Sequence, residues 1–322
     1  MAPSSIKLNS GYSIPTIGLG LWRSKPDEVA NAVEVALRNG YQHLDSATVY
    51  KNEKEVGAGI KASGVARDQI FITSKLWNSH HRAADAARQL DATLADLQTD
   101  YLDLYLIHWP VAFRNHGNDD LFPEDAATGE IDLDHDITLA DTWKVMEGFV
   151  RAGKVRSIGV SNFTQDKLEA LLASGIEIKP AVNQIEAHPF LQQPALLAWC
   201  QSNGIVVQAY SPMGNNIHNL PRALDHDVII DIAQRLGKEP AQVLISWALQ
   251  RGTVVLPKSV TPSRIKSNLE VFELPADEVA RITALDTHTR YNFPIRFGVN
   301  IFGEATDEQV RAGVDEWLAS KK

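Results

Sequence analysis

Four ionisable side chains in the first third of the chain could together transfer a proton. Asp45, Lys75 and His108 each end an apolar segment, and Tyr50 lies on the loop after Asp45. An ion pair between Asp45 and Lys75 would hold an ammonium group near the phenol of Tyr50. An adjacent cation favours phenolate, so it would lower the pKa of the phenol from its usual value of about 10. A phenol tuned in this way is a general acid, and His108 could orient the oxygen that it protonates while another group delivers hydride.

Each of these residues also has a purely structural interpretation. Asp45 and Lys75 could form a salt bridge that only stabilises the fold, His108 could be a hydrogen-bonded histidine at a rim, and Tyr50 could belong to an ordinary surface turn. The position of the four residues in the fold has to separate these interpretations from a catalytic one.

The spacing of apolar residues predicts alternating strands and helices behind a β-hairpin that turns at Asn9-Ser10-Gly11. Segments of strand length occupy residues 16–21, 41–44, 70–75, 102–108, 155–160, 181–184, 205–210 and 254–258. Segments with helical character occupy residues 26–39, 51–57, 81–97, 142–151, 165–172, 195–201, 228–236, 241–250 and, as the last expected helix, 262–269. Eight strand–helix units without a composition break predict an α/β fold: one domain over residues 1–322, a closed (β/α)₈ TIM barrel with a long C-terminal loop.

A barrel of this kind makes the four residues a testable set. Its active site lies at the carboxyl ends of the strands, where the following loops meet. The side chains expected there are Asp45, Lys75, His108, Ser161, Asn162, Gln184, Tyr210 and Lys258. Several titratable and polar groups directed at one rim mark a candidate site, which favours the catalytic interpretation.

Composition restricts the partners and the compartment. Hydrophobic residues make up 44% of the chain, charged residues 22%, and the formal net charge is −9. An acidic chain is not typical of proteins that bind nucleic acid or anionic membranes, and no apolar run is long enough to span a bilayer. The single cysteine, Cys200, lies in an apolar helical run and is expected in the core, and no apolar signal region opens the chain. These features predict a cytoplasmic protein, and we expect a monomer.

Two motifs that would indicate another kind of site match their patterns poorly. Gly18-Leu19-Gly20 resembles the start of a dinucleotide fingerprint, but Arg23 stands where the third glycine is required. His43 and the pair His80-His81 could be metal ligands, although further ligands at suitable spacing are missing. A metal-dependent barrel hydrolase is therefore the remote alternative.

Three motifs in this order resemble the aldo-keto reductase family, and the resemblance covers nearly the whole chain. The motifs are residues 40–47 with Tyr50 and Gly57, residues 102–110, and residues 256–265. The resemblance implies a catalytic tetrad of Asp45, Tyr50, Lys75 and His108. It also implies NAD(P)H bound in an extended form across the rim. Gln42 replaces an arginine that is frequent in the family, but it lies outside the tetrad.

The resemblance also implies a set of cofactor-binding residues. They are Trp22, Asp45, Ser161, Asn162, Gln184, Tyr210, Ser211, Met213, Gly214, Asn215, Lys258, Ser259, Val260, Arg264 and Asn268. Tyr210 would stack on the nicotinamide, and Lys258, Ser259 and Arg264 would surround a 2′-phosphate. Two cations and a hydroxyl suit a phosphate, which favours NADPH over NADH. Residues 214–219 contain no acidic residue to close over the pyrophosphate, so fast cofactor release is expected.

Substrate choice is less clearly encoded. Trp22, Tyr50, His108 and Trp109 are expected to line the carbonyl end of the pocket, with residues 111–136 and 287–302 shaping the remainder. The tail is similar to that of fungal aldehyde reductases and glycerol dehydrogenases, which implies small hydroxyaldehydes such as glyceraldehyde and aromatic aldehydes, reduced reversibly to alcohols. A xylose or aldose reductase, and a family member that binds cofactor without turnover, remain alternatives.

Overall fold

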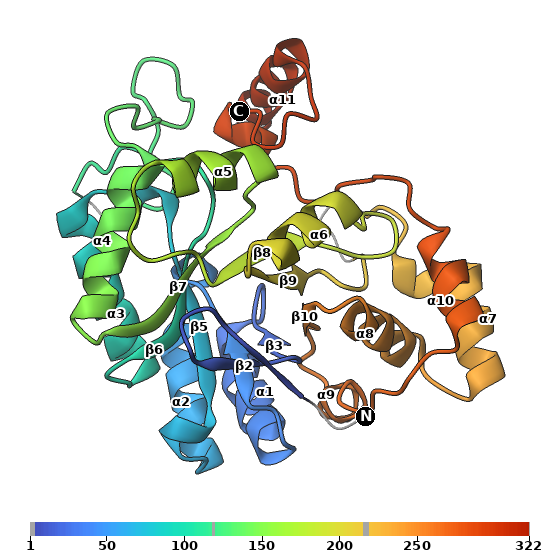
Figure 1. The fold of residues 1–322 in the computed structure, drawn as a ribbon. Helices are drawn as coiled ribbons and strands as arrows, with labels where there is room; N and C mark the ends of the chain where they lie inside the picture. The colour runs from blue at the N-terminus through green and yellow to red at the C-terminus, as the bar shows by residue number, and fades with distance from the viewer. Residues whose placement is uncertain (1–3, 118–119, 215–218, 322) are drawn as a thin grey trace.

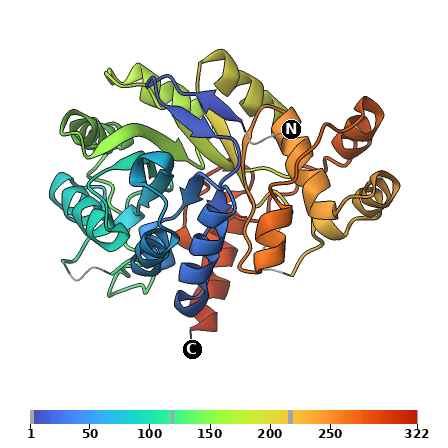
Figure 2. The same ribbon diagram turned by 90° about the horizontal axis from the view of Figure 1, so that it is seen from below.

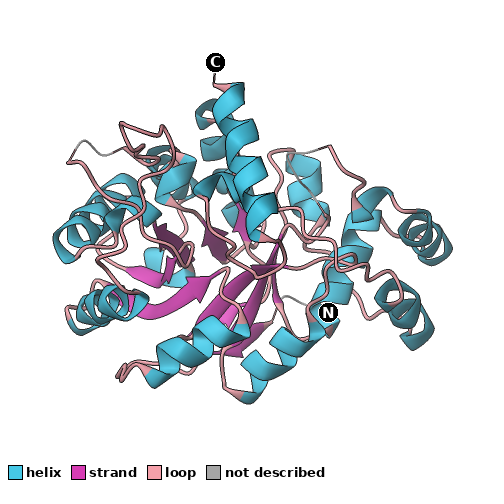
Figure 3. Ribbon diagram, turned by 90° about the horizontal axis from the view of Figure 1, so that it is seen from above, coloured by secondary structure: helices cyan, strands magenta, loops and turns pink. Residues whose placement is uncertain are grey.

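Eight parallel strands form the centre of the molecule, surrounded by helices (Figures 1 and 3). The computed structural model describes residues 4–117, 120–214 and 219–321. The parallel strands are β3 (Leu19–Gly20), β4 (His43–Asp45), β5 (Phe71–Leu76), β6 (Leu102–Ile107), β7 (Val155–Ser161), β8 (Val182–Glu186), β9 (Val206–Tyr210) and β10 (Val254–Leu256). Their order in the sheet follows the chain, so each strand pairs with the next one, as the alternation of strands and helices predicts.

The sheet closes into a barrel between its first and last strands. Ile17 forms a parallel bridge with Val255, and the backbone N–H groups of Gly18 and Gly20 donate to the carbonyls of Val255 and Pro257 at 2.9 and 3.0 Å. Only two residues of the predicted strand 16–21 have regular strand geometry. The closure confirms the predicted (β/α)₈ TIM barrel.

A helical segment follows each barrel strand. The helices are α1 (Pro26–Arg38), α2 (Glu53–Ser63), α3 (Ala83–Leu97), α4 (Leu139–Arg151), α5 (Gln165–Ala173), α6 (Pro194–Ser202), α7 (Asp227–Leu236), α8 (Pro240–Gln250), α9 (Pro262–Ser267), α10 (Ala276–Thr283) and α11 (Asp307–Ser320). Proline at the first position of α1 and acidic residues in its first turn suit a helix N-terminus. Buried apolar residues of α1 to α10 pack on the outside of the barrel in one large cluster.

The N-terminal hairpin closes one end of the barrel. Strands β1 (Ser5–Lys7) and β2 (Ser13–Pro15) pair antiparallel around the predicted turn, shown in blue in Figure 2. Leu8 and Ile14 of the hairpin pack with Phe71, Leu104 and other buried residues in a separate apolar cluster. Because this end is filled by apolar side chains, a site has to open at the opposite end.

One prediction about helices is wrong. The segment at 262–269 is not the last helix, because α10 and α11 follow it, and α11 lies beyond the loop expected at 287–302. Helix α11 begins with a capping box formed by Thr306 and Gln309, but only Val310 and Val314 of the helix are buried. A helix with so narrow an apolar face shows little periodicity in the sequence. Among the described residues, no helix combines the length and the apolarity that crossing a bilayer requires.

Candidate active site

The ammonium group of Lys75 is the centre of the polar cluster at the barrel's open end. Strand β5 carries Lys75 into the interior, where its side chain is fully buried. Its Nζ atom donates to Asp45 Oδ1 and to the carbonyl of Ser46, both at 2.7 Å, and to the hydroxyl of Tyr50 at 3.3 Å. Tyr50 ends a 3₁₀ helix, η1 (Thr48–Tyr50), where an irregular loop was expected. The structure thus brings the predicted carboxylate, ammonium and phenol into one hydrogen-bonded chain.

His108 completes the predicted tetrad from the adjacent strand end. Its ring packs edge-on against Tyr50, with the ring centroids 6.0 Å apart, and edge-on against Trp77 at 5.2 Å. Burial lowers the pKa of His108 well below its ordinary value, and the nearby Lys75 ammonium lowers it further. His108 is therefore a neutral imidazole at neutral pH, able to donate one hydrogen bond without carrying charge.

The prediction that Lys75 lowers the pKa of Tyr50 is wrong in this structure. Burial raises the pKa of Tyr50 well above its ordinary value, and the carboxylates of Asp45 and Glu53 raise it further. Burial also lowers the pKa of Lys75, outweighing the opposite effect of Asp45. Tyr50 consequently remains protonated at neutral pH, and it can donate a proton to an oxygen on which negative charge develops.

A cavity of about 500 Å³ opens above this cluster. Its wall includes most of the side chains predicted for the site: Trp22, Asp45, Tyr50, His108, Trp109, Ser161, Asn162, Gln184, Tyr210, Ser211, Met213 and Lys258. Their convergence on one cavity is what parallel strands in a closed barrel produce, because all carboxyl ends meet at the same rim.

One wall of the cavity carries a fixed set of amide and hydroxyl groups. The Tyr210 hydroxyl donates to Asn162 Oδ1 at 2.7 Å, and the Asn162 amide donates to the His108 carbonyl at 3.0 Å. Gln184 donates to Asp45 Oδ2 at 2.7 Å, which joins this wall to the tetrad. Asn162 and Ser211 have positive φ values of 63° and 51°, a conformation that costs energy in residues other than glycine and is concentrated at functional sites.

The other described residues that were predicted to bind the cofactor do not line the cavity. Ser259 and Val260 precede the short helix α9, which carries Arg264 and is capped at its C-terminus by Asn268. Ser259 Oγ accepts from the backbone N–H of Thr261, Arg264 is exposed and Asn268 is buried. Gly214 packs beside Ala223, where a Cβ atom would come within 2.9 Å of its backbone nitrogen. Asn215, and with it most of the loop expected to favour fast release, lies outside the described residues.

Several cavity residues were missed by the sequence analysis. They are Leu21, Arg23, Val49, Trp77 and Leu256. Phe122, Asn292, Pro294, Arg296 and Phe297 belong to the two loops that were expected to shape the pocket, although none of them was named individually. Trp77 directly follows β5, so its position just beyond Lys75 could have identified it. Phe122 and Phe297 come from the loops at 111–136 and 287–302, whose paths across the rim leave no periodic signal in the sequence. Together with Trp77 they belong to a third apolar cluster beside the cavity.

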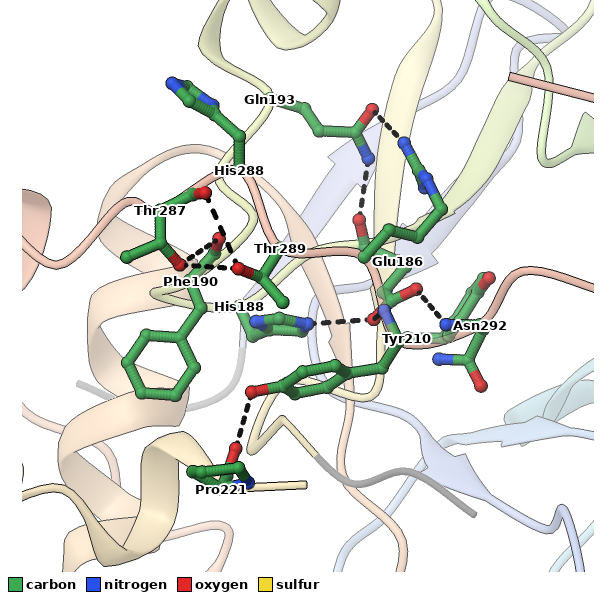
Figure 4. A network of polar contacts seen from close by, with 12 residues as sticks. Glu186, His188, Phe190, Gln193, Tyr210, Pro221, Thr287, His288, Thr289 and Asn292 are labelled. Carbon is green, nitrogen blue, oxygen red and sulfur yellow. Dashed lines mark hydrogen bonds and ion pairs between the residues drawn. The ribbon is translucent and has the colours of Figure 1, made fainter. Parts of the chain in front are cut away.

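A buried carboxylate holds the C-terminal segment against the barrel. Glu186 at the end of β8 accepts from His188 at 2.9 Å and from the backbone N–H of Asn292 at 2.8 Å (Figure 4). It also accepts from the backbone N–H of Tyr291 at 2.9 Å. Burial alone would raise the pKa of Glu186, but these hydrogen bonds outweigh it and lower the pKa below its ordinary value. The network fixes the point from which Pro294, Arg296 and Phe297 reach the cavity.

The competing motifs have structural explanations. A Cβ atom at Gly18 would come within 2.8 Å of the His43 ring, so this glycine permits close packing inside the barrel. His43 hydrogen-bonds Pro15 and Thr73, and Cys200 is buried. In the part of the chain that the structure describes, no group of three or more His, Cys, Asp or Glu side chains could hold a metal ion.

The burial of His81 is expected to make the folded protein less stable in acid. Burial lowers the pKa of His81 to about 3 from 6.5, so the unfolded chain binds more protons between these values. The free energy of unfolding therefore falls as pH decreases, by about 2 kcal/mol for this histidine between pH 7 and pH 5. Urea unfolding at both pH values should show that the free energy of unfolding of wild type falls by about 2 kcal/mol more than that of His81→Gln when the pH is lowered from 7 to 5. His288→Gln, at an exposed site, should match wild type, and equal losses in wild type and His81→Gln would contradict the prediction.

Comparison with known proteins identifies the family to which this chain belongs. The model of the aldo/keto reductase family matches residues 16–287. A D/L-glyceraldehyde reductase of Hypocrea jecorina is 44% identical over 325 residues, covering 96% of both chains. An NADPH-dependent D-xylose reductase of Meyerozyma guilliermondii is 44% identical over 307 residues, covering 90% of this chain and 96% of that protein.

A solved structure agrees with the fold. The aldose reductase from Schistosoma japonicum superposes with a TM-score of 0.86 at 42% sequence identity, covering 95% of this chain and 100% of the other. The family match spans most of the chain, and the relatives are similar over nearly their whole length. This chain therefore belongs to the aldo/keto reductase family and is an oxidoreductase that acts on carbonyl or alcohol groups.

Proposed function

We propose that this protein reduces aldehydes to alcohols with NADPH, and in the reverse direction oxidises small alcohols such as glycerol with NADP⁺. The observation that carries the proposal is the chain from Asp45 through the Lys75 ammonium to the Tyr50 hydroxyl at the cavity. A protonated phenol beside a buried cation is suited to give a proton to a carbonyl oxygen. The proposed substrates are small hydroxyaldehydes such as glyceraldehyde and aromatic aldehydes.

Each residue of the tetrad has a proposed role. Tyr50 donates its proton to the substrate's carbonyl oxygen, and Lys75 stabilises the phenolate that results. Asp45 keeps Lys75 charged in a fully buried position, and neutral His108 donates a hydrogen bond that orients the carbonyl. A bound nicotinamide would supply the hydride that the carbonyl carbon accepts. The aromatic wall, including Trp22 and Trp109, excludes water around the reacting atoms.

The described residues suit a phosphorylated dinucleotide. Tyr210 offers an aromatic face at the wall, fixed through Asn162, next to Ser161 and Gln184. Lys258 is exposed at the cavity and Arg264 is exposed on the following helix, and neither forms an ion pair with any described residue. Two unpaired cations along one path are what a 2′-phosphate requires, so NADPH is proposed over NADH.

Lys258→Ala should weaken NADPH binding by roughly tenfold or more, because a hydrogen bond to a charged group contributes about 1.5–3 kcal/mol. NADH affinity should change little, since NADH lacks the 2′-phosphate. Dissociation constants from fluorescence titration with both cofactors would measure the difference. Lys61→Ala, on helix α2, is the control and should leave both affinities unchanged. Equal losses for the two cofactors would contradict a 2′-phosphate role.

The names of the relatives support the proposed substrate class. One is named as a glyceraldehyde reductase and another as an NADPH-dependent xylose reductase, so xylose reduction is the second candidate. A panel of glyceraldehyde, xylose and benzaldehyde with NADPH would rank the substrates by kcat/KM. We also propose that residues 1–322 act as a single cytoplasmic domain and as a monomer.

A further inference from the structure

Glu53 is a buried acidic residue beside the tetrad for which the proposed mechanism has no role. It begins helix α2, shortly after Tyr50 in the chain, and only 5% of the residue is exposed. Its carboxyl group lies between α2, strand β5 and helix α3, because Ser74 of β5 and Thr93 of α3 both donate to it. A buried carboxylate is costly unless hydrogen bonds compensate for its lost hydration, so these contacts call for an explanation.

The hydrogen bonds of Glu53 connect it to the two elements that carry the ammonium and the phenol. Ser74, which precedes Lys75 on β5, donates to Glu53 Oε1 at 2.5 Å. Thr48, which begins the 3₁₀ helix that ends at Tyr50, donates to Oε2 at 3.4 Å. The Glu53 carboxyl group is therefore bonded to an immediate neighbour of Lys75 and to the turn that presents the proton donor.

The directions of these hydrogen bonds suit an ionised Glu53. The Gln89 amide donates to the Thr48 hydroxyl at 3.1 Å, so that hydroxyl can pass its own proton on to Glu53. Thr93 donates to Oε2 at 3.0 Å, and Ser74 donates to the other oxygen. An ionised carboxylate accepts hydrogen bonds and donates none, so a network whose donors end on it is satisfied when it is charged.

A negative charge on Glu53 favours the protonated forms of Tyr50 and Lys75. Burial raises the pKa of Tyr50, and the Glu53 carboxylate raises it further. Burial lowers the pKa of Lys75, and Glu53 acts against this effect. Two other titratable groups face Glu53. The charge of Asp96 on α3 opposes its ionisation, and Tyr105 on β6 has a pKa that burial raises and Glu53 raises further.

Glu53 differs from Asp45 in how it reaches these two groups. Asp45 on β4 accepts a hydrogen bond from the Lys75 ammonium itself at 2.7 Å. Glu53 acts through space and through its bonds to Thr48 and Ser74. The two carboxylates therefore place two negative charges around one buried ammonium, and the second of them does not touch the reacting atoms.

We propose that Glu53 is a positioning residue whose buried negative charge keeps Tyr50 and Lys75 protonated and so sets the alkaline end of the pH range in which the protein reduces aldehydes. The inference rests on the proposed aldehyde reduction, to which it adds a residue outside the tetrad. The reaction itself is unchanged: hydride goes to the aldehyde carbon, and the Tyr50 proton goes to its oxygen. Glu53 neither gives nor takes a proton in the cycle.

The test is the pH dependence of kcat/KM for benzaldehyde at saturating NADPH, which reports the ionisation of the essential acid. Wild type should lose activity in the alkaline range. Glu53→Gln should move this loss to lower pH by about one unit, because Tyr50 and Lys75 both release a proton more readily. In benzyl alcohol oxidation with NADP⁺ the rise of activity with pH should move in the same direction, since the phenolate must then accept a proton.

Two variants separate the charge of Glu53 from its packing. Glu53→Asp keeps the charge on a shorter side chain, so its alkaline loss of activity should stay near the wild-type pH even where turnover falls. Glu147→Gln neutralises another buried acidic residue, on α4, which accepts from the backbone N–H groups of Glu177 and Ile178. It should leave the pH profile unchanged.

Reduced turnover in Glu53→Gln with the wild-type pH profile would show a structural role alone and overturn the inference, while the reductase function stands. An equal shift in Glu53→Asp would also overturn it, because the charge would not be the cause. If Glu53→Gln does not fold, Ser74→Ala decides: it removes a donor to the carboxylate, favours its neutral form, and should shift the profile in the same direction by less. An unshifted profile there would overturn the inference. Absence of benzaldehyde and glyceraldehyde turnover in wild type would overturn the proposed function and this inference with it.

Discussion

Tyr50→Phe should lower aldehyde-reductase turnover by at least ~10²-fold, the usual scale for loss of a general acid. The variant removes only the hydroxyl that receives the 3.3 Å hydrogen bond from Lys75, so the ring contact with His108 is kept. The fold should be retained, because the change leaves the apolar surface of the ring in place. NADPH affinity should change little, since the phenol acts on the substrate's oxygen.

Steady-state turnover with glyceraldehyde and fluorescence titration of NADPH would measure both effects. Tyr12→Phe makes the same chemical change on the hairpin, at the closed end of the barrel, and should retain full turnover. Near-normal turnover in Tyr50→Phe would exclude the phenol as the proton donor and leave His108 as the next candidate.

Asp45→Asn should be among the most destabilising single substitutions in this protein. It leaves the Lys75 ammonium fully buried, with the Ser46 carbonyl and the Tyr50 hydroxyl as its remaining partners. Removing one partner of a buried ion pair costs about 3–5 kcal/mol. The loss in the free energy of unfolding should depend on pH. Burial already lowers the pKa of Lys75, and Asp45 is the main group that raises it.

The sign of that pH dependence follows from proton linkage. In Asp45→Asn the folded-state pKa of Lys75 falls further, so the unfolded chain binds more protons below about pH 10.4. The free energy of unfolding should therefore rise as pH increases from about 7 to about 9. Urea unfolding at both pH values tests this, with Asp68→Asn at an exposed position as the matched control. If the free energy of unfolding of Asp45→Asn lies within about 1 kcal/mol of the wild-type value at neutral pH, Asp45 and Lys75 do not act as a buried charge pair.

The polar rim could be predicted from the sequence because strand periodicity and the barrel's topology act together. Asp45, Lys75 and His108 stand at the ends of apolar segments, and a closed parallel barrel brings all such ends to one mouth. Gln184 and Tyr210 were placed by the same reasoning. Position along a strand is local information, so the sequence carries it directly.

The electrostatics of the site could not be predicted in the same way. Proximity of Lys75 to Tyr50 was foreseen, but the direction of the phenol's pKa depends on how much water remains around it. Burial decides that direction, and the carboxylates of Asp45 and of Glu53, which lies on helix α2, act in the same sense. Desolvation is a property of the packed interior and has no signature in residue spacing.

The sequence indicated the two loops that form the far wall of the cavity, but not which of their side chains reach it. Phe122, Arg296 and Phe297 come from two loops that are distant in the chain and meet across the rim. Glu186 fixes one of these loops through two backbone N–H groups, a contact that depends on tertiary structure alone. The individual side chains of the far wall were therefore identified only in the structure, whereas those proposed to perform the chemistry were identified in the sequence.

The most direct test of the account is repeated reduction of glyceraldehyde by the purified protein with NADPH. A reductase must release NADP⁺ in every cycle, whereas a cofactor-binding relative can retain it. We predict that NADPH absorbance falls continuously, that the number of cofactor molecules consumed far exceeds the number of protein molecules, and that glycerol appears in equal amount. Consumption of a single equivalent of NADPH, with the cofactor retained through gel filtration and no glycerol formed, would contradict it.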